Sequence, residues 1–262
     1  MEKEKELLVI IPANNEEQNI SKVMLQLEDQ HIKETADILV IDDASSDGTG
    51  QIVQKKKCCM VRNVFCLGYG SSLQLGYRYA LRRGYRYIIQ LDADGQHDAC
   101  NIPVIYERLR REDEKGRYPD IVLASRFMEG SSDFPVSVLK RAAYAWFRSL
   151  IYMVTGRRIK DPTTGLQGLS RKAFSFYAGY QNFDDCYPDA NMVIQMLLLG
   201  FYVTEIPAVM HRRAGGKSMH SGIKAVWYMC RMFFDIPAIV FRIKGLKKDA
   251  DFVWKEDKIS EK

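Results

Sequence analysis

One stretch decides the fold: Tyr87-Ile88-Ile89-Gln90-Leu91-Asp92-Ala93-Asp94-Gly95-Gln96-His97-Asp98. An apolar run of strand length ends abruptly in two carboxylates, Asp92 and Asp94, spaced two residues apart. In extended chain alternate side chains point to the same side, so both carboxylates can face one ligand. Mg²⁺ and Mn²⁺ favour such oxygens together with phosphate oxygens and water. The stretch predicts a buried strand leading to a metal–diphosphate site, with an acidic turn as the alternative because Asp and Gly favour turns.

Similar apolar runs occur on both sides of this stretch and alternate with helical patterns. The expected strands cover residues 7–11, 37–41, 61–66, 86–91 and 120–124, and the expected helices cover 17–30, 47–57, 71–83 and 99–113. This alternation is typical of a mostly parallel sheet covered by crossover helices. The sequence therefore predicts an α/β fold of the Rossmann-like kind.

Polar clusters follow three of the expected strands, namely Pro12-Ala13-Asn14-Asn15-Glu16, Asp42-Asp43 and Asp92-Ala93-Asp94. Ligands of such sheets bind beyond the carboxyl ends of the strands, so the three clusters are expected to converge on one edge. Neither a Gly-x-Gly-x-x-Gly motif nor a P-loop follows the first strand. Their absence from the sequence argues against a dinucleotide-dependent oxidoreductase and a P-loop NTPase.

The second half has a different pattern. We expect a helix over residues 137–155, a turn-rich segment from Asp161 to Gly168, a helix over 189–199, a strand over 201–206 and a basic loop over 212–218. The apolar run from Ala225 to Phe241 is broken by charges and Pro237, so it does not predict a transmembrane helix of about 20 apolar residues. Its charged residues, with Lys224 and Arg242, fall in one narrow sector of a helix.

This amphipathic segment suits an in-plane membrane helix, a docking surface for a small membrane protein partner, or a helix packed on the catalytic core. The expected division is a catalytic domain over residues 1–218, an amphipathic helical extension over 219–248 and a charged tail over 249–262.

Composition is that of a globular enzyme: 262 residues, 47% hydrophobic and 27% charged. The net charge of +5 favours phosphate-bearing ligands or an anionic membrane surface and does not by itself indicate nucleic acid. Six cysteines form no Cys-x-x-Cys pair, and the chain opens on alternating Glu and Lys instead of a signal peptide. We therefore expect a cytoplasmic protein with reduced thiols, peripheral at the cytoplasmic face of the membrane.

Taken in order, these motifs resemble the family 2 glycosyltransferases, in particular the branch of dolichyl-phosphate mannose synthases and bacterial polyprenyl-phosphate glycosyltransferases. The resemblance spans about residues 7–220. It is carried by Val9–Glu17, Val40–Thr49, Leu91–His97, Ala124–Phe127, Asp161–Gly165, Tyr187–Asp189, Glu205–Pro207 and Arg213–Ser218.

The resemblance implies a GT-A fold and a set of site residues. The implied nucleotide-sugar contacts are Pro12, Asn14, Glu16, Ile41, Asp43, Asp92, Ala93, Arg126 and Arg213; the implied ligands of Mg²⁺ or Mn²⁺ are Asp92, Asp94 and Gln96; Arg126, Arg141 and Lys217 would contact an acceptor phosphate; and Asp94, Asp189, Arg213 and Lys217 would be catalytic. Asp189 matches a general-base position, with a helix cap as the alternative.

Three departures from the family pattern stand out. Asn14 replaces a common aromatic, Cys66–Leu73 keeps two glycines of a usual motif but loses its Asn and Ala, and Met219 replaces a frequent basic residue. A UDP-sugar and a GDP-sugar therefore both remain open as donors.

The expected function is an inverting, metal-dependent glycosyltransferase that moves a sugar from a nucleotide-diphosphate sugar to a polyprenyl phosphate. Two alternatives stay open: the same fold acting on a glycan or protein hydroxyl, and a nucleotide-sugar-binding partner of a membrane protein without turnover.

Overall fold

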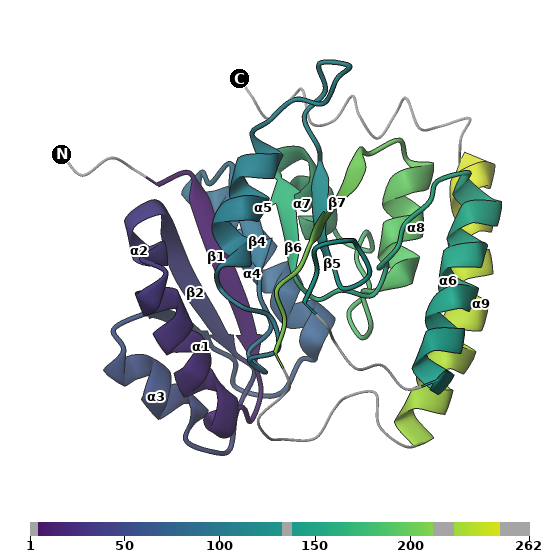
Figure 1. Ribbon diagram of the computed structural model, residues 1–262. Helices are drawn as coiled ribbons and strands as arrows, with labels where there is room; N and C mark the ends of the chain where they lie inside the picture. Colours follow the sequence, from purple (N-terminus) through teal and green to yellow (C-terminus); the bar gives the residue numbers. More distant parts are fainter. Residues whose placement is uncertain (1–4, 133–137, 212–222, 247–262) are drawn as a thin grey trace.

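The computed structural model describes residues 5–132, 138–211 and 223–246. Within these residues, seven strands form one sheet in the order β3-β2-β1-β4-β6-β5-β7 (Figure 1). Their bounds are β1 (Leu7–Ala13), β2 (Ala36–Asp42), β3 (Cys59–Arg62), β4 (Tyr87–Gln90), β5 (Ile121–Ser125), β6 (Gln167–Ser170) and β7 (Val203–Pro207). Strand β6 is antiparallel to β4 and β5, and the other neighbouring pairs are parallel. The predicted mostly parallel α/β fold is confirmed.

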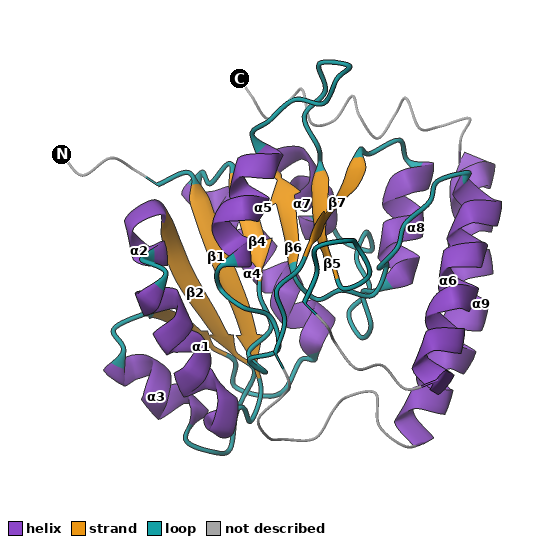
Figure 2. Ribbon diagram, viewed as in Figure 1, coloured by secondary structure: helices purple, strands orange, loops and turns teal. Residues whose placement is uncertain are grey.

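Helices cover both faces of this sheet (Figure 2). They are α1 (Glu17–Asp29), α2 (Ile32–Thr35), α3 (Thr49–Lys55), α4 (Tyr69–Arg83), α5 (Asn101–Leu109), α6 (Val138–Thr155), α7 (Arg171–Ala178), α8 (Ala190–Leu198) and α9 (Ile223–Leu246). None of the helices in the described ranges is long and apolar enough to cross a membrane.

Strand β1 shows why the sheet has two cores. Leu8 and Ile10 point into a core shared with α4, α6, α7, α8 and α9, whereas Leu7, Val9 and Ile11 point into a second core shared with α1, α3 and α5. Because successive side chains of a strand alternate and both faces are covered, the strand must be apolar throughout.

Two parts of the predicted element list are wrong. Strand β3 covers 59–62 instead of 61–66: Asn63 still donates its backbone N–H to Asp42 O at 2.9 Å, but farther along Leu67 and Gly68 donate theirs to the Asp43 carboxylate instead of to a strand. Strand β6 and helix α7 were not predicted, and Gly168, expected in a turn, lies in β6.

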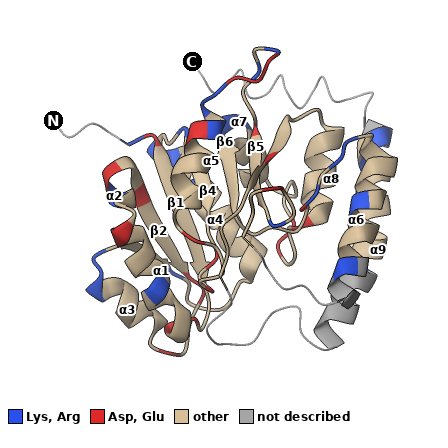
Figure 3. Ribbon diagram, viewed as in Figure 1, with Lys and Arg blue, Asp and Glu red and all other residues tan. Residues whose placement is uncertain are grey.

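The carboxyl ends of β1, β2 and β4 meet at one edge of the sheet. Ala13 of β1 is in register with Asp42 of β2, and Leu91, just after β4, donates its N–H to Ile10 O at 3.0 Å. Acidic positions gather on the loops at this edge, below the strands in Figure 3. The predicted convergence of the three polar clusters is confirmed.

Candidate active site

Asp92 lies at the centre of the site, two residues beyond β4. Tyr69, the first residue of α4, donates its hydroxyl to Asp92 Oδ1 at 2.8 Å. The Asp92 carboxyl group also packs directly on the backbone of Gly165, where an added Cβ would lie only 1.9 Å from Asp92 Oδ2. Gln90 holds this glycine in place, since its Nε2 donates to Gly165 O at 3.0 Å. Asp92 is thus fixed between the start of α4 and the turn before β6.

Negative charge is concentrated around this carboxyl group. Burial, as the largest influence, and the charges of Asp94, Asp189 and Glu16 together raise the pKa of Asp92 to about 7, although the hydrogen bond from Tyr69 lowers it. Three carboxylates therefore lie close enough to Asp92 to oppose its ionisation. A divalent cation would relieve this repulsion, and the oxygen donors present fit Mg²⁺ or Mn²⁺.

The turn after Asp92 carries the other two predicted metal ligands. Asp94 Oδ1 accepts the N–H of Gln96 at 3.0 Å, and Gly95 adopts a φ of +71° that permits this tight turn. Asp92, Asp94 and Gln96 are half-buried, whereas Ala93 and Gly95 are buried. Ala93, predicted as a nucleotide-sugar contact, packs in the second core, which leaves its backbone for a ligand.

A second acidic group lies on the loop before α8. The ligand atoms of Asp184, Asp185 and Cys186 lie within 4.8 Å of one another. However, the carboxylate of Asp184 already accepts hydrogen bonds from the N–H groups of Cys186 and Tyr187 and from Asn191 Nδ2. We interpret this group as a hydrogen-bonding centre of the loop and the Asp92 region as the better metal site.

Asp43 organises the loop that leads into α4. Its carboxylate accepts hydrogen bonds from Leu67 N and Gly68 N, both at 2.8 Å, and from Asn63 Nδ2 at 2.7 Å. Burial raises the pKa of Asp43, but these hydrogen bonds outweigh burial and hold the pKa below its usual value. Asn14 Nδ2 donates to the Asp43 backbone O at 2.6 Å, so two predicted nucleotide-sugar residues lie together.

The remaining predicted residues at the ends of β1 and β2 differ in how they face the site. Pro12 is buried at the end of β1, and Glu16 is half-buried, with Oε2 accepting from Asn19 Nδ2 at 2.6 Å. Ile41 is fully buried in the first core, so its side chain packs under α4. Asp42 is also fully buried and pairs with Arg62 at 3.3 Å, which makes it a structural residue.

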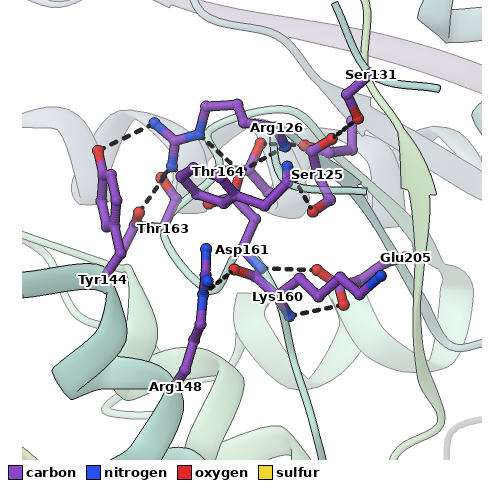
Figure 4. Close-up of polar contacts among 12 residues, drawn as sticks. Ser125, Arg126, Ser131, Tyr144, Arg148, Lys160, Asp161, Thr163, Thr164 and Glu205 are labelled. Atoms are coloured by element: carbon purple, nitrogen blue, oxygen red, sulfur yellow. Dashed lines mark hydrogen bonds and ion pairs between the residues drawn. The ribbon is translucent and has the colours of Figure 1, made fainter. Parts of the chain in front are cut away.

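Arg126, directly after β5, is held by protein groups on several sides (Figure 4). It forms a bidentate pair with Asp161, with Nε to Oδ2 at 2.7 Å and Nη2 to Oδ1 at 2.5 Å. Nη2 also donates to Thr163 Oγ1 at 2.9 Å, and Nη1 donates to the Tyr144 hydroxyl of α6 at 3.3 Å. Asp161 is in turn fixed by Glu205 of β7, whose Oε1 accepts the Asp161 N–H at 2.8 Å. These contacts use most of the Arg126 donors and leave little of its side chain for a phosphate.

Asp189 immediately precedes α8 and faces the cluster. Its side chain makes no capping hydrogen bond to this helix, so the capping alternative is not what the structure has. Its charge raises the pKa of Asp92, Tyr69 and Arg126, which places the carboxylate near all three. Arg141 lies on α6 with an exposed side chain. Arg213 and Lys217 lie outside the described residues.

Sequence reasoning missed Tyr69 and Gly165 as site residues, although both lie in motifs that it singled out. It also missed Tyr144 and the partnership of Arg126 with Asp161. His97 is buried beside Arg126; burial, followed by the positive charge of Arg126, lowers the pKa of His97 to about 3. The imidazole is therefore neutral and adds no positive charge to the site.

Comparisons with known proteins agree with this geometry. Residues 8–177 match the model of the family described as Glycosyl transferase family 2. The chain is 27% identical to the undecaprenyl-phosphate mannosyltransferase of Micrococcus luteus, over 82% of this chain and 88% of the relative. It is 28% identical to the polyprenol monophosphomannose synthase of Mycolicibacterium smegmatis, over 82% and 81% of the two chains.

Among solved structures, glucosyl-3-phosphoglycerate synthase from Mycobacterium tuberculosis, in complex with Mn²⁺, UDP and glucosyl-3-phosphoglycerate, superposes with a TM-score of 0.64. The likeness covers 92% of this chain and 80% of that chain at 16% identity, so it supports the fold alone.

Proposed function

Since the chain belongs to glycosyl transferase family 2, we propose that this glycosyltransferase moves a sugar from a UDP- or GDP-sugar onto a polyprenyl phosphate, with inversion at the sugar carbon. Two relatives, similar over about four fifths of this chain, are named for a polyprenol or undecaprenyl phosphate product or acceptor. The observation that carries the proposal is the concentration of carboxylates around Asp92 at the carboxyl edge of the sheet.

A bound Mg²⁺ or Mn²⁺ ion would supply Lewis-acid stabilisation of the nucleoside diphosphate leaving group. Asp92 and Asp94 would hold the ion, with Gln96 as a further oxygen donor. Tyr69 and Gly165 keep Asp92 in one position, which lowers the cost of ordering the site when the donor binds. The loop anchored by Asp43, together with Pro12, Asn14 and Glu16, would form the nucleoside side of the pocket.

An acceptor hydroxyl is the second candidate, and one observation favours it. Asp189 lies near Asp92, and a carboxylate at this position could accept a proton from an attacking hydroxyl. A phosphate acceptor is already an anion and needs no such base. Replacement Asp189→Asn therefore separates the two: a large loss of turnover favours a hydroxyl acceptor, and a small loss favours a phosphate.

A lipid acceptor implies contact with a membrane surface, and we assign this contact to α9. Its outward face carries Phe233, Phe234 and Phe241, which are 60%, 71% and 83% exposed. Its opposite face buries Met232 and Ile236 in the first core. Exposed aromatic side chains at this density suit insertion into the headgroup region of a bilayer.

A donor and acceptor screen tests the proposal. Purified protein with Mn²⁺ or Mg²⁺ would be incubated with UDP- and GDP-sugars, with and without polyprenyl phosphate, and glycolipid would be measured in the organic extract. We expect product from one donor, lost with EDTA and with Asp94→Asn. The matched control is Asp113→Asn, which removes a carboxylate paired with Arg117 on the surface, away from the site.

Absence of glycolipid with every donor, while nucleotide-sugar binding persists, would reject the polyprenyl phosphate acceptor. Product that survives both EDTA and Asp94→Asn would reject the metal assignment instead.

A further inference from the structure

The charged side chains of α9, namely Arg231, Asp235 and Arg242, lie beside the loop of residues 181–189, which leads to Asp189. Arg231 Nη2 donates to Asp184 Oδ1 at 3.1 Å, and Arg231 Nε donates to Asp235 one turn later on the same helix at 3.0 Å. The Arg231 guanidinium also lies 5.7 Å from the centre of the Tyr187 ring. A helix distant in sequence thus contacts the segment that carries the candidate base.

Asp184 passes this contact on to the loop. Its Oδ1 also accepts the N–H groups of Cys186 at 2.8 Å and Tyr187 at 3.0 Å, and its Oδ2 accepts Asn191 Nδ2 at 2.8 Å. Asn191 is 1% exposed, and its Oδ1 accepts the N–H of Asp189 at 2.9 Å. A continuous chain of hydrogen bonds therefore runs from Arg231 through Asp184 and Asn191 to the backbone of Asp189.

The connection runs beside a cavity. A cavity of about 260 Å³ lies between α8, α9 and residues 181–185, and Arg231, Asp184 and Asn191 line it. On its other side the loop is held against α4, where Ser71 N donates to Asp185 O at 3.2 Å, two residues after Tyr69. The loop is thus fixed between α9 and the helix start that orients Asp92.

We propose that Arg231 is a positioning residue, which through Asp184 and Asn191 sets the backbone of Asp189 relative to Asp92. Without the arginine, the Asp184 carboxylate keeps its hydrogen bonds inside the loop but loses its link to α9. The loop can then shift as a unit, and displacement of a reacting group by about 1 Å can cost on the order of a hundredfold in rate. For its kinetic consequence this inference rests on the second candidate function, an acceptor hydroxyl deprotonated by Asp189, and α9 then belongs to the catalytic unit.

Two variants and one control test it. Arg231→Ala removes the donor, and Asp184→Asn removes the charge of its acceptor. The control Arg242→Ala removes another polar link of the same helix, because Arg242 donates to Gln195 Oε1 at 2.7 Å and to Gln181 O at 3.3 Å and not to Asp184. Turnover, the dissociation constant of the donor nucleotide, and amide hydrogen exchange of residues 184–192 would be measured for each.

With a hydroxyl acceptor, we expect kcat to fall about ten- to hundredfold in Arg231→Ala and Asp184→Asn, with donor affinity within about twofold of the wild type. The double variant should fall no further than the worse single one, because the two residues act through one contact. Amides of residues 186–191 should exchange faster in both variants and not in Arg242→Ala. Unchanged exchange and unchanged kcat in Arg231→Ala would overturn the proposal, as would equal effects in Arg242→Ala.

Hydrogen exchange separates this inference from the proposed function, because it needs no turnover. If the acceptor is a polyprenyl phosphate, or if the wild-type protein transfers no sugar at all, the exchange of residues 186–191 alone decides whether Arg231 positions the loop.

Discussion

Asp92 is the residue whose ionisation should be most sensitive to metal. Burial and neighbouring carboxylates raise its pKa in the folded protein to about 7, from about 4 in the unfolded chain. Since the pKa is higher in the folded protein, the protonated Asp92 carboxyl group stabilises the folded state. This contribution to the free energy of unfolding is fully present below about pH 4 and is lost as the pH rises through 7. In EDTA, the wild type should therefore lose stability relative to Asp92→Asn between pH 5 and 8, by on the order of a few kcal/mol.

Thermal unfolding of both proteins across this pH range checks the prediction. Mn²⁺ should stabilise the wild type more at pH 8 than at pH 5, because metal and proton compete for the same oxygens. Asp113→Asn serves as the control, since hydrogen bonds from Arg117 already lower the pKa of the Asp113 carboxyl group to about 2, so that it titrates below this range. Parallel pH curves for wild type and Asp92→Asn would contradict the assignment.

Gly165 should be as important as the acidic residues, although it has no side chain. In Gly165→Ala the new Cβ would meet Asp92 Oδ2 at 1.9 Å, so the Asp92 carboxyl group must move. We expect turnover to fall at least about a hundredfold and stability to fall by about 1–3 kcal/mol. Gly245→Ala is the matched control, because no atom lies within 4 Å of its added Cβ, and there turnover should not change. Kinetics and thermal unfolding of the two variants decide the matter.

For single residues, the sequence predicted which side chains form the candidate site, but it did not predict the hydrogen bonds and ion pairs that fix their positions. Asp92, Asp94 and Asp189 were identified from strand ends and motifs, and the structure brings them together. Arg126 was expected at a phosphate, whereas it is bound to Asp161, 35 residues away. Local patterns cannot reveal such a pair, because its partner is defined only once β5 and the turn before β6 meet.

At the scale of elements, the Arg126–Asp161 pair joins β5 to the turn before β6, and its contacts extend to α6 and β7. Asp161 is fully buried, so Asp161→Asn would leave the Arg126 charge without its counter-ion. We expect a loss of about 3–5 kcal/mol, or about 6–20 °C in Tm. If Arg126 only bound phosphate, the Tm would not change.

Thermal unfolding in the absence of nucleotide measures this directly. Asp113→Asn again provides the comparison, since the pair of Asp113 with Arg117 lies at the surface and such pairs contribute about 1 kcal/mol or less. Equal Tm values for the two variants would show that the buried pair does not hold these elements together.

Strand β6 was missed for a physical reason. Its sequence, Gln167-Gly168-Leu169-Ser170, has neither β-branched residues nor apolar alternation, yet it is buried between β4 and β5. Gly168 is required there because an added Cβ would lie 2.2 Å from Ile105 Cγ2 of α5. The residues of β6 are therefore determined by the room left between β4, β5 and α5, and not by local strand propensity. Helix α7 had a local signal, since Ser170 caps it by accepting the Ala173 N–H, but this capping residue is also the last residue of the missed strand.

For the whole molecule, the orientation of α9 is the informative result. The sequence identified its charged sector, and a water-soluble surface helix would turn this sector outward. In the structure Arg231 and Asp235 are half-buried beside α8, the exposed Arg242 borders the same cavity, and three exposed phenylalanines face away from the core. The periodicity of apolar residues in the sequence identifies the apolar and polar faces of a helix. Which parts of these faces pack against the rest of the protein depends on tertiary contacts that the sequence pattern does not reveal.

This orientation predicts binding to membranes through α9. Replacing Phe233, Phe234 and Phe241 by serine removes the exposed aromatic groups. Full insertion of each phenylalanine would contribute about 1.5–3 kcal/mol to the free energy of membrane binding. Binding to vesicles that contain phosphatidylglycerol, measured by sedimentation, should weaken at least tenfold, while nucleotide-sugar affinity stays the same. The control replaces Val104 and Tyr118, which are 51% and 56% exposed away from α9, and should bind as the wild type does. Equal binding by both variants would remove the membrane role of this face and leave a protein partner as its occupant, because a face with this much exposed aromatic surface still needs cover.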